Sequence, residues 1–237
     1  CGDCPRVILG SPVAGIAAEE IIDPTPAIRE IADRYIGDPE YANLPRKFKT
    51  ALTGHPVHDV APEVNDVAFV GVVHPEHGPG FDLWVGGGLS TNPMLAVRLG
   101  TWVPLEEVAE VWAGVVAVFR DYGYRRLRTR ARIKFLVADW GAEKFREVLQ
   151  TEYLKRRLID GPAPAVPTQP GDHVGVHLQK DGKNFVGLSP VAGRVSGSNL
   201  VRLAELAEAH GSRRIRTTPL QKLLILDLEE SQIDSLI

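Results

Sequence analysis

Residues 44–50, Leu-Pro-Arg-Lys-Phe-Lys-Thr, hold the side chains with the clearest chemistry. Pro45 disfavours helix at the residue before it and lacks an N–H group, which is typical of a chain entering a strand. Alternate side chains of a strand share a face, so Lys47 and Lys49 would lie on one face, about 7 Å apart. Two ammonium groups at that spacing repel unless water or an anion separates them. Two interpretations stay open: a solvated strand face above a buried Phe48, or an anion-binding site.

A second basic segment lies at residues 124–134, where six of eleven residues are Arg or Lys. If the segment is helical, Arg128 and Arg132 share one face, and Arg130 and Lys134 share another. Like charges four residues apart destabilise a solvated helix, so the pattern favours a polyanionic partner. A nucleic acid is the weaker candidate, because the segment has no aromatic stacking platform and the chain has a net charge of −3 and a pI near 6.2.

Three consecutive glycines, Gly86, Gly87 and Gly88, follow an apolar segment. Glycine at such a place indicates that the backbone approaches something closely, either another strand or the acidic groups of a cofactor held by N–H groups. The spacing matches neither the dinucleotide-binding fingerprint nor the P-loop.

The candidate metal and redox groups are weaker. His74, Glu76 and His77 lie on one turn rich in Pro and Gly, where solvated side chains are more common than a metal site. Cys1 and Cys4 are too few for a four-thiolate zinc or iron–sulfur site, and the apolar residues after them indicate a strand rather than the helix of a redox pair.

Patterning predicts the elements that position these groups. A Pro-rich linker at 160–171 marks a domain boundary, because its composition favours an extended, stiff chain. Beyond it, the order strand–strand–helix–strand–strand, with a hairpin at Asp181-Gly182 and Ser198 as the helix cap, predicts a small open α+β sandwich. The predicted strands are 6–9, 44–50, 65–73, 81–85, 173–178, 184–188, 213–217 and 223–228, and the predicted helices are 27–35, 104–122, 142–154 and 198–209.

The composition is that of a globular protein. The 237 residues are 44% hydrophobic and 24% charged, enough for one large or two small domains. No apolar segment of about 18 residues or more predicts a membrane span. The chain begins without Met and ends where a helix begins at 227–237, so we expect a processed or excised piece.

These motifs together resemble the middle of the ferredoxin-dependent, siroheme-containing sulfite and nitrite reductases, essentially from end to end. The resemblance rests on segments 1–6, 44–50, 65–66, 83–90, 121–123, 132–134, 193–195 and 218–221. It implies an α+β fold: a siroheme-binding mixed α/β domain at 1–159, the linker at 160–171, and a ferredoxin-like half-domain at 172–237. It also implies an oxidoreductase with siroheme and a 4Fe–4S cluster, which reduces sulfite to sulfide by six electrons from ferredoxin.

The resemblance assigns roles residue by residue. Arg6, Lys47 and Lys49 fall on cations of the catalytic pocket above the siroheme iron, where converging charges stabilise a bound oxyanion. Repulsion among them should lower the pKa of at least one lysine and make it a better proton donor. The implied siroheme-binding residues are Arg46, Asn65, Gly86, Gly87, Gly88, Arg132, Lys134 and Gln221, and Cys1 matches a cysteine joined to a tyrosine in one subgroup.

Some family features are missing from this sequence. The four cluster cysteines and a fourth pocket arginine would lie outside it, so we expect no metal ligands in this chain and no sulfite reduction by this polypeptide alone. Lys49 favours sulfite over nitrite, because plant-type nitrite reducers tend to have asparagine there. The alternatives are nitrite reduction to ammonia or a non-catalytic scaffold that binds another anion. We expect a cytoplasmic protein without nucleic-acid or membrane partners.

Overall fold

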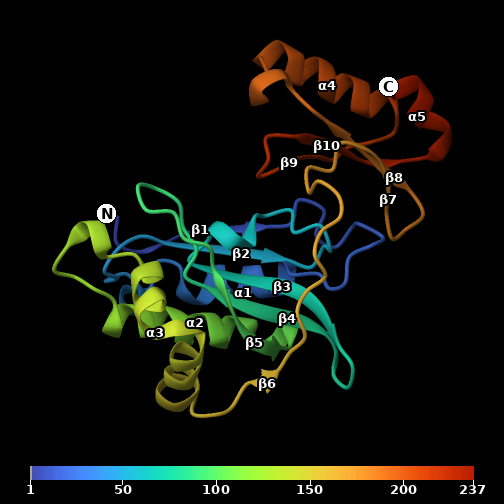
Figure 1. The fold of residues 1–237 in the computed structure, drawn as a ribbon. Coiled ribbons are helices and arrows are strands. Elements are labelled where there is room, and N and C mark those ends of the chain that lie inside the picture. The colour runs from blue at the N-terminus through green and yellow to red at the C-terminus, as the bar shows by residue number, and fades with distance from the viewer. Residues whose placement is uncertain (1) are drawn as a thin grey trace.

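The computed structural model describes residues 2–237, which form a large and a small α/β unit (Figure 1). The sheet of the large unit has the order β1-β2-β3-β4-β5-β6. Strands β1 to β3 are parallel, and β3 to β6 pair antiparallel. The strands are β1 (Pro5–Gly10), β2 (Phe48–Thr53), β3 (Val67–His74), β4 (Gly78–Val85), β5 (Val97–Val103) and β6 (Ile159–Asp160).

Three helices cover one face of this sheet, α1 (Thr25–Tyr35), α2 (Val108–Tyr122) and α3 (Ile133–Val148). Phe48 and Leu52 of β2 point into that core, and Trp112 of α2 donates its indole N–H to Thr50 Oγ1 at 2.8 Å. Because strand residues alternate, Lys49 lies on the opposite face of β2. One side of the strand is therefore committed to the core, and the other carries the cation.

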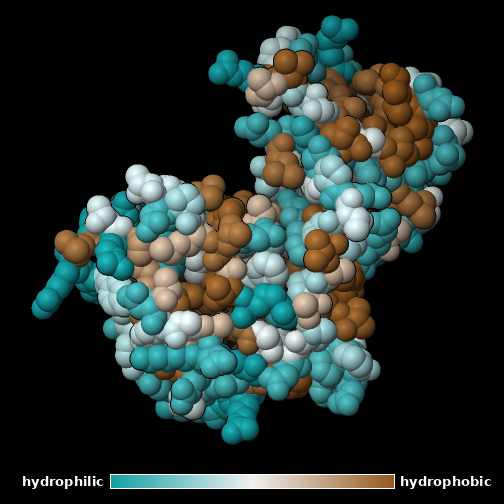
Figure 2. All heavy atoms as spheres, viewed as in Figure 1, coloured by the Kyte–Doolittle hydropathy of each residue, from teal (hydrophilic) through white to brown (hydrophobic). Residues whose placement is uncertain are grey.

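The small unit has a four-stranded antiparallel sheet of order β7-β8-β10-β9, made of β7 (Gly175–Leu178), β8 (Asn184–Leu188), β9 (Ile215–Thr217) and β10 (Leu223–Leu228). Helices α4 (Gly197–Ala209) and α5 (Glu230–Leu236) pack on it through a core that includes Ala207 and Ile233. Exposed apolar side chains remain on α4, including Leu200 and Val201, and Figure 2 shows hydrophobic residues gathered on this unit. The predicted strand–strand–helix–strand–strand order and the α+β class are confirmed.

Direct contacts join the two units. The other face of the small sheet packs Phe185, Leu224 and Leu226 against Val13, Ile16 and Ala17, which follow β1. Ala17 also forms a bridge with Gln179, and Lys180 pairs with Glu20 at 2.6 Å. Residues 161–171 between the units contain no helix or strand, whereas Asp160, the first residue of the predicted linker, belongs to β6.

The structure corrects several predicted bounds. Strand β2 begins at Phe48, so Lys47 precedes the strand, directly after a bend at Pro45 and Arg46. Residues 128–130 form a short 3-10 turn and α3 begins at Ile133, so the helical pairing of Arg128 with Arg132 is wrong. Gly141, with φ 74°, kinks α3 just before the helix predicted at 142–154, and a π-helical segment, Leu149–Leu154, forms the end of that predicted helix; the part of α3 before Gly141 was not predicted.

Two further differences concern strands and caps. Strands β5 and β6 were not predicted. The cap of α4 is Ser196, whose Oγ accepts the Asn199 N–H at 3.2 Å, and Ser198 lies inside the helix. No helix among residues 2–237 is both long and apolar enough to cross a bilayer.

Candidate functional site

A cavity of about 350 Å³ collects most of the predicted cations. It opens where the bend before β2 faces the segment that leads into α3. None of its lining residues is acidic, and five carry a positive charge. The lining residues are Arg46, Lys47, Ser90, Thr91, Asn92, Arg128, Thr129, Arg132, Lys134 and Phe135.

Lys49 lies beside this cavity, half-buried on β2. Its Nζ donates to the Val64 carbonyl oxygen at 3.2 Å. Burial lowers the pKa of Lys49, Asp66 opposes that shift, and Arg132 and Lys47 lower it further. The predicted fall in a lysine pKa is therefore confirmed in direction, but burial contributes more to it than repulsion between cations.

Arg132 and Lys134 already have partners within the protein. The Arg132 guanidinium donates to both carboxylate oxygens of Asp66 at 2.8 Å. Lys134 is 3% exposed, and its Nζ donates to the carbonyl oxygens of Gly88, Leu89 and Asn92. Its three N–H donors thereby hold the 88–92 loop, whose residues form one wall of the cavity.

Arg6 of β1 lies next to the cavity. Its guanidinium donates to the Gly2 carbonyl oxygen at 3.4 Å. A Cβ built on Gly2 would lie 3.7 Å from Arg6 Nη2 and 3.9 Å from Arg128 Nη2, so both guanidiniums flank the same residue. Arg128 in turn pairs with Asp3 at 2.9 Å. Arg128, which lines the cavity, and Arg6 on β1 therefore lie close to each other.

The three glycines have different neighbours. A Cβ on Gly86 would approach Val137 to 2.8 Å, and one on Gly87 would approach the Glu63 carbonyl oxygen to 2.3 Å. These two glycines therefore allow close packing within the protein, against α3 and the turn at residues 62–64 rather than against another strand. Of the three, only Gly88 lies against residues that line the cavity, because its Cβ would lie 3.0 Å from Arg132 Nη2.

Two further predicted residues are absent from the cavity lining, and a third lies outside the described residues. Asn65 is buried and its amide donates to the Ala61 carbonyl oxygen at 2.9 Å. Gln221 lies in the turn between β9 and β10 of the small unit, and it is absent from the cavity lining. Cys1 lies outside the described residues, so its predicted role stays a prediction.

A buried group at the junction of the units escaped sequence analysis. His55, Asp59 and His173 place possible ligand atoms within 4.8 Å of one another. His173 Nε2 lies 2.8 Å from Asp59 Oδ2, and Ser11 and Thr53 donate to the same carboxylate at 2.7 Å each. His55 Nδ1 accepts the Val57 N–H at 3.3 Å, which leaves its proton on Nε2. These contacts describe a hydrogen-bonded clasp between the units rather than a metal centre.

These hydrogen bonds also lower the pKa of Asp59. Burial alone would raise the pKa of Asp59, but hydrogen bonds from His173, Ser11 and Thr53 outweigh it and lower the pKa. No single motif in the sequence marks the clasp, because its members come from segments separated by 114 residues.

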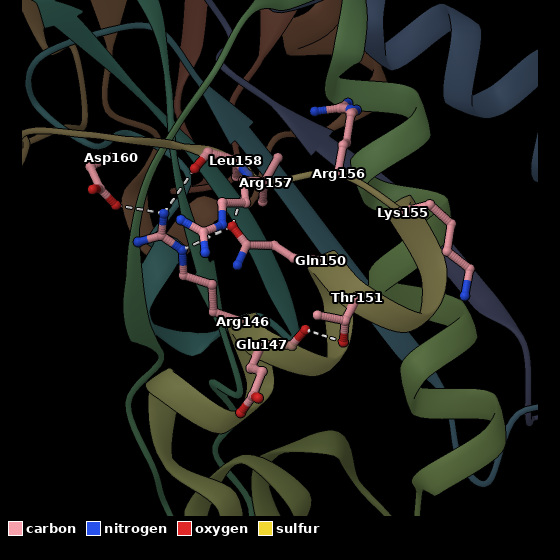
Figure 3. Close-up of a pocket in the computed structure, with 9 residues that line it drawn as sticks. All are labelled: Arg146, Glu147, Gln150, Thr151, Lys155, Arg156, Arg157, Leu158 and Asp160. Carbon is pink, nitrogen blue, oxygen red and sulfur yellow. Dashed lines mark hydrogen bonds and ion pairs between the residues drawn. The ribbon is translucent and has the colours of Figure 1, made fainter.

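Two other polar features are structural. Figure 3 shows a second cavity around Arg146, whose guanidinium points to the Leu158 carbonyl oxygen and to Asp160, at 2.9 and 2.6 Å. Arg146 thereby ties α3 to the short strand β6. On the β3–β4 turn, His74 Nδ1 accepts the N–H groups of Glu76 and His77, so it stabilises the turn.

Known proteins match the whole chain. The model for the nitrite and sulphite reductase 4Fe-4S domain matches residues 1–158, and the model for the nitrite/sulfite reductase ferredoxin-like half domain matches residues 177–237. The chain is 67% identical over 237 residues to sulfite reductase (ferredoxin) 2 of Mycolicibacterium paratuberculosis, covering 100% of this chain and 42% of that protein. It is 35% identical over 242 residues to the ferredoxin–nitrite reductase of Synechococcus elongatus, covering 99% of this chain and 47% of that protein.

The fold comparison agrees. A solved structure of the Mycobacterium tuberculosis NirA protein superposes with a TM-score of 0.94 at 66% identity, covering 100% of this chain and 43% of that one. The chain thus spans less than half the length of these relatives. On the match of both domain models and on this identity, the chain belongs to the nitrite and sulphite reductase family.

Proposed function

We propose that this chain forms the siroheme- and oxyanion-binding part of a ferredoxin-dependent sulfite reductase, which reduces sulfite to sulfide by six electrons. The observation that carries the proposal is a cavity whose walls hold five cations and no carboxylate, in a chain of net charge −3. Three of these cations already have partners within the protein, and the remaining two, Arg46 and Lys47, favour an anionic ligand in the cavity. The relatives named sulfite reductase (ferredoxin) support the choice of substrate and donor.

Siroheme, which the family implies, fits this cavity in chemical terms. It carries eight carboxylates, and among the described residues Arg46 and Lys47 have no ion-pair partner within 4.0 Å. These two residues would pair with carboxylates or the substrate, and Ser90 and Thr91 would donate hydroxyl hydrogen bonds. When bound, siroheme supplies the iron that coordinates the oxyanion and delivers electrons to it. Arg132 and Lys134 hold the cavity walls, because their donors are already used within the protein.

The 4Fe–4S cluster does not fit the residues of this chain. A cubane cluster needs four thiolates, and the sequence has two cysteines. No step is therefore assigned to a cluster on this polypeptide.

The chain's own cations would bind and protonate the substrate. Arg6, Lys47 and Lys49 would offset the charge of the oxyanion, and each oxygen lost as water requires two protons. Lys49 suits proton donation at its Nζ, because its lowered pKa brings it closer to neutrality. Lysine at this position favours sulfite. Nitrite is the second candidate, which the 35% identical nitrite reductase supports. A cytoplasmic location is part of the same proposal.

The test uses the intact protein that carries this chain, purified with its cofactors. We expect a siroheme Soret band and sulfite reduction with reduced ferredoxin at a higher kcat/KM than nitrite reduction. Lys47→Met should lower kcat/KM for sulfite at least tenfold. Lys144→Met, which removes an exposed lysine over Trp140, is the matched control and should leave kcat/KM unchanged. A colourless, inactive intact protein would overturn the proposal.

A further inference from the structure

One carboxylate lies at the base of the cation cluster and is fully buried. Asp66, just before β3, is 0% exposed. Its Oδ1 accepts the Arg132 Nε–H at 2.9 Å, and the Nη2 group of Arg132 contacts both of its oxygens at 2.8 Å. Its Oδ2 also accepts the backbone N–H of Lys49 at 2.7 Å. One side chain therefore fixes the Arg132 guanidinium to the segment of β2 that carries Lys49.

Asp66 also supplies negative charge to the cluster. Burial, Arg132 and Lys47 all lower the pKa of Lys49, and among the groups that act on Lys49 only Asp66 raises it. The same holds for Lys134, whose pKa is lowered by burial and by Arg132 and raised by Asp66. The other carboxylate of the cluster, Asp3, is partly exposed and serves Arg128 at the outer end. Asp66 thus balances the inner cations.

We propose that Asp66 is a positioning residue of this site: it holds Arg132 and the start of β2 in place so that Lys49 keeps its proton beside the bound oxyanion. The role of Lys49 toward an oxyanion rests on the proposed function. The placement of Arg132 and the effect on the Lys49 amine do not, because they concern contacts within this chain.

A purely structural ion pair is the competing explanation, and the chain contains a matched example. Asp82 on β4 is also 0% exposed, accepts from Arg98 Nε, and accepts the Trp84 indole N–H at 2.7 Å. Neither Asp82 nor Arg98 lines the cation cavity. Asp82→Asn therefore removes an equally buried carboxylate from an arginine on the same sheet without touching the cluster.

The experiment measures the Lys49 amine directly. In this 237-residue chain with 13C-labelled lysine, the Lys49 Cε signal is titrated by NMR in the wild type, Asp66→Asn and Asp82→Asn. We expect Asp66→Asn to lower the Lys49 pKa relative to the wild type, because the carboxylate that raises this pKa is lost. We expect Asp82→Asn to leave it unchanged. The Arg132 Nε–H signal should exchange with solvent at least tenfold faster in Asp66→Asn only.

Asp66→Glu and activity complete the test. If Asp66→Asn does not fold, Asp66→Glu replaces it in the test, because it keeps the negative charge but displaces Arg132. In Asp66→Glu the Lys49 pKa should stay close to the wild-type value, whereas the Arg132 Nε–H should exchange with solvent faster than in the wild type. In the intact cofactor-loaded protein, the alkaline limb of the kcat–pH profile should move to lower pH in Asp66→Asn. Equal Lys49 titrations in all variants would overturn the proposal even if sulfite is reduced. A protein that binds no siroheme but shows the NMR shifts would overturn only the proposed function.

Discussion

Lys134 illustrates what a buried charge does at the scale of a single residue. The resemblance assigned it to a cofactor carboxylate, yet its amine donates to three carbonyl oxygens of the 88–92 loop. A lysine can be 3% exposed when each of its donors has an acceptor. We infer that its contribution to the site is to shape the wall that carries Ser90 and Thr91.

Replacing Lys134 by Met should therefore cost stability as well as function. Three carbonyl oxygens would lose their donor, and leaving buried acceptors unpaired should lower the free energy of unfolding by about 3 kcal/mol. Urea unfolding followed by circular dichroism measures this change. Lys144→Met should change the same quantity by less than about 1 kcal/mol, because only an exposed cation–π contact is lost. Equal effects of the two variants would contradict this role.

Sequence analysis located the cations better than it located their partners. Lys47, Lys49 and Arg132 were singled out from local density and spacing, and Arg46 from the family resemblance. Arg46, Lys47 and Arg132 line the cavity, and Lys49 lies close enough to Lys47 and Arg132 for both to lower its pKa. Their partners were not predictable, because the Arg132–Asp66 contact joins residues 66 positions apart and no local pattern encodes it. The functional roles of these residues stay predictions.

At the scale of elements, predictions failed where a turn or a tertiary contact interrupts a regular pattern. Strand β5 contains Arg98, whose guanidinium pairs with buried Asp82, and Gly100, whose φ is 65°. Glycine in a strand interior weakens the strand pattern, and the carboxylate that pairs with Arg98 lies on another strand, so the local sequence does not reveal it. Likewise, the part of α3 before the kink at Gly141 was not predicted as a helix, whereas the part after it coincides with the start of the predicted helix at 142–154.

The N-terminus of α4 offers a direct test of one correction. Ser196 accepts the Asn199 N–H, so Ser196→Ala should lower the free energy of unfolding by about 1 kcal/mol. Ser198→Ala should change it by less than half as much, because that hydroxyl caps no backbone group. Each variant removes one hydroxyl group, and the two positions lie two residues apart at the start of α4. Thermal or urea unfolding measures the two changes in stability. A larger loss for Ser198→Ala would restore the original prediction.

At the scale of the whole molecule, acid should destabilise the fold, through His55 at the junction of the two units and His58 within the large unit. Burial lowers the pKa of His55 and of His58, so both rings are neutral in the folded protein. A group with a depressed folded pKa takes up its proton more readily when unfolded. Its contribution to stability is full above the unfolded value of about 6.5 and is lost as the pH falls below it. Protonation of Asp59, with its lowered pKa, extends the loss below pH of about 4.

The midpoint of urea unfolding, measured from pH 8 to pH 4, checks this expectation. The midpoint should fall progressively below pH of about 6.5, and the fall should be smaller in the double variant His55→Gln, His58→Gln. His74→Gln, on the exposed β3–β4 turn, should retain the wild-type dependence. A midpoint that stays constant between pH 7 and pH 5 would contradict the expectation, because it would mean that the pKa values of these rings do not differ between the folded and unfolded protein.

The clasp between Asp59 and His173 should keep the two units together even when the peptide chain between them is cut. The small unit is attached by that clasp, by the Ala17–Gln179 bridge and by an apolar seam, none of which runs through residues 163–169. A protease that nicks this segment should leave two pieces migrating together under native conditions and separating only in denaturant. The peptide connection would then serve to bring the two pieces together during biosynthesis, and their own surfaces would keep them assembled afterwards.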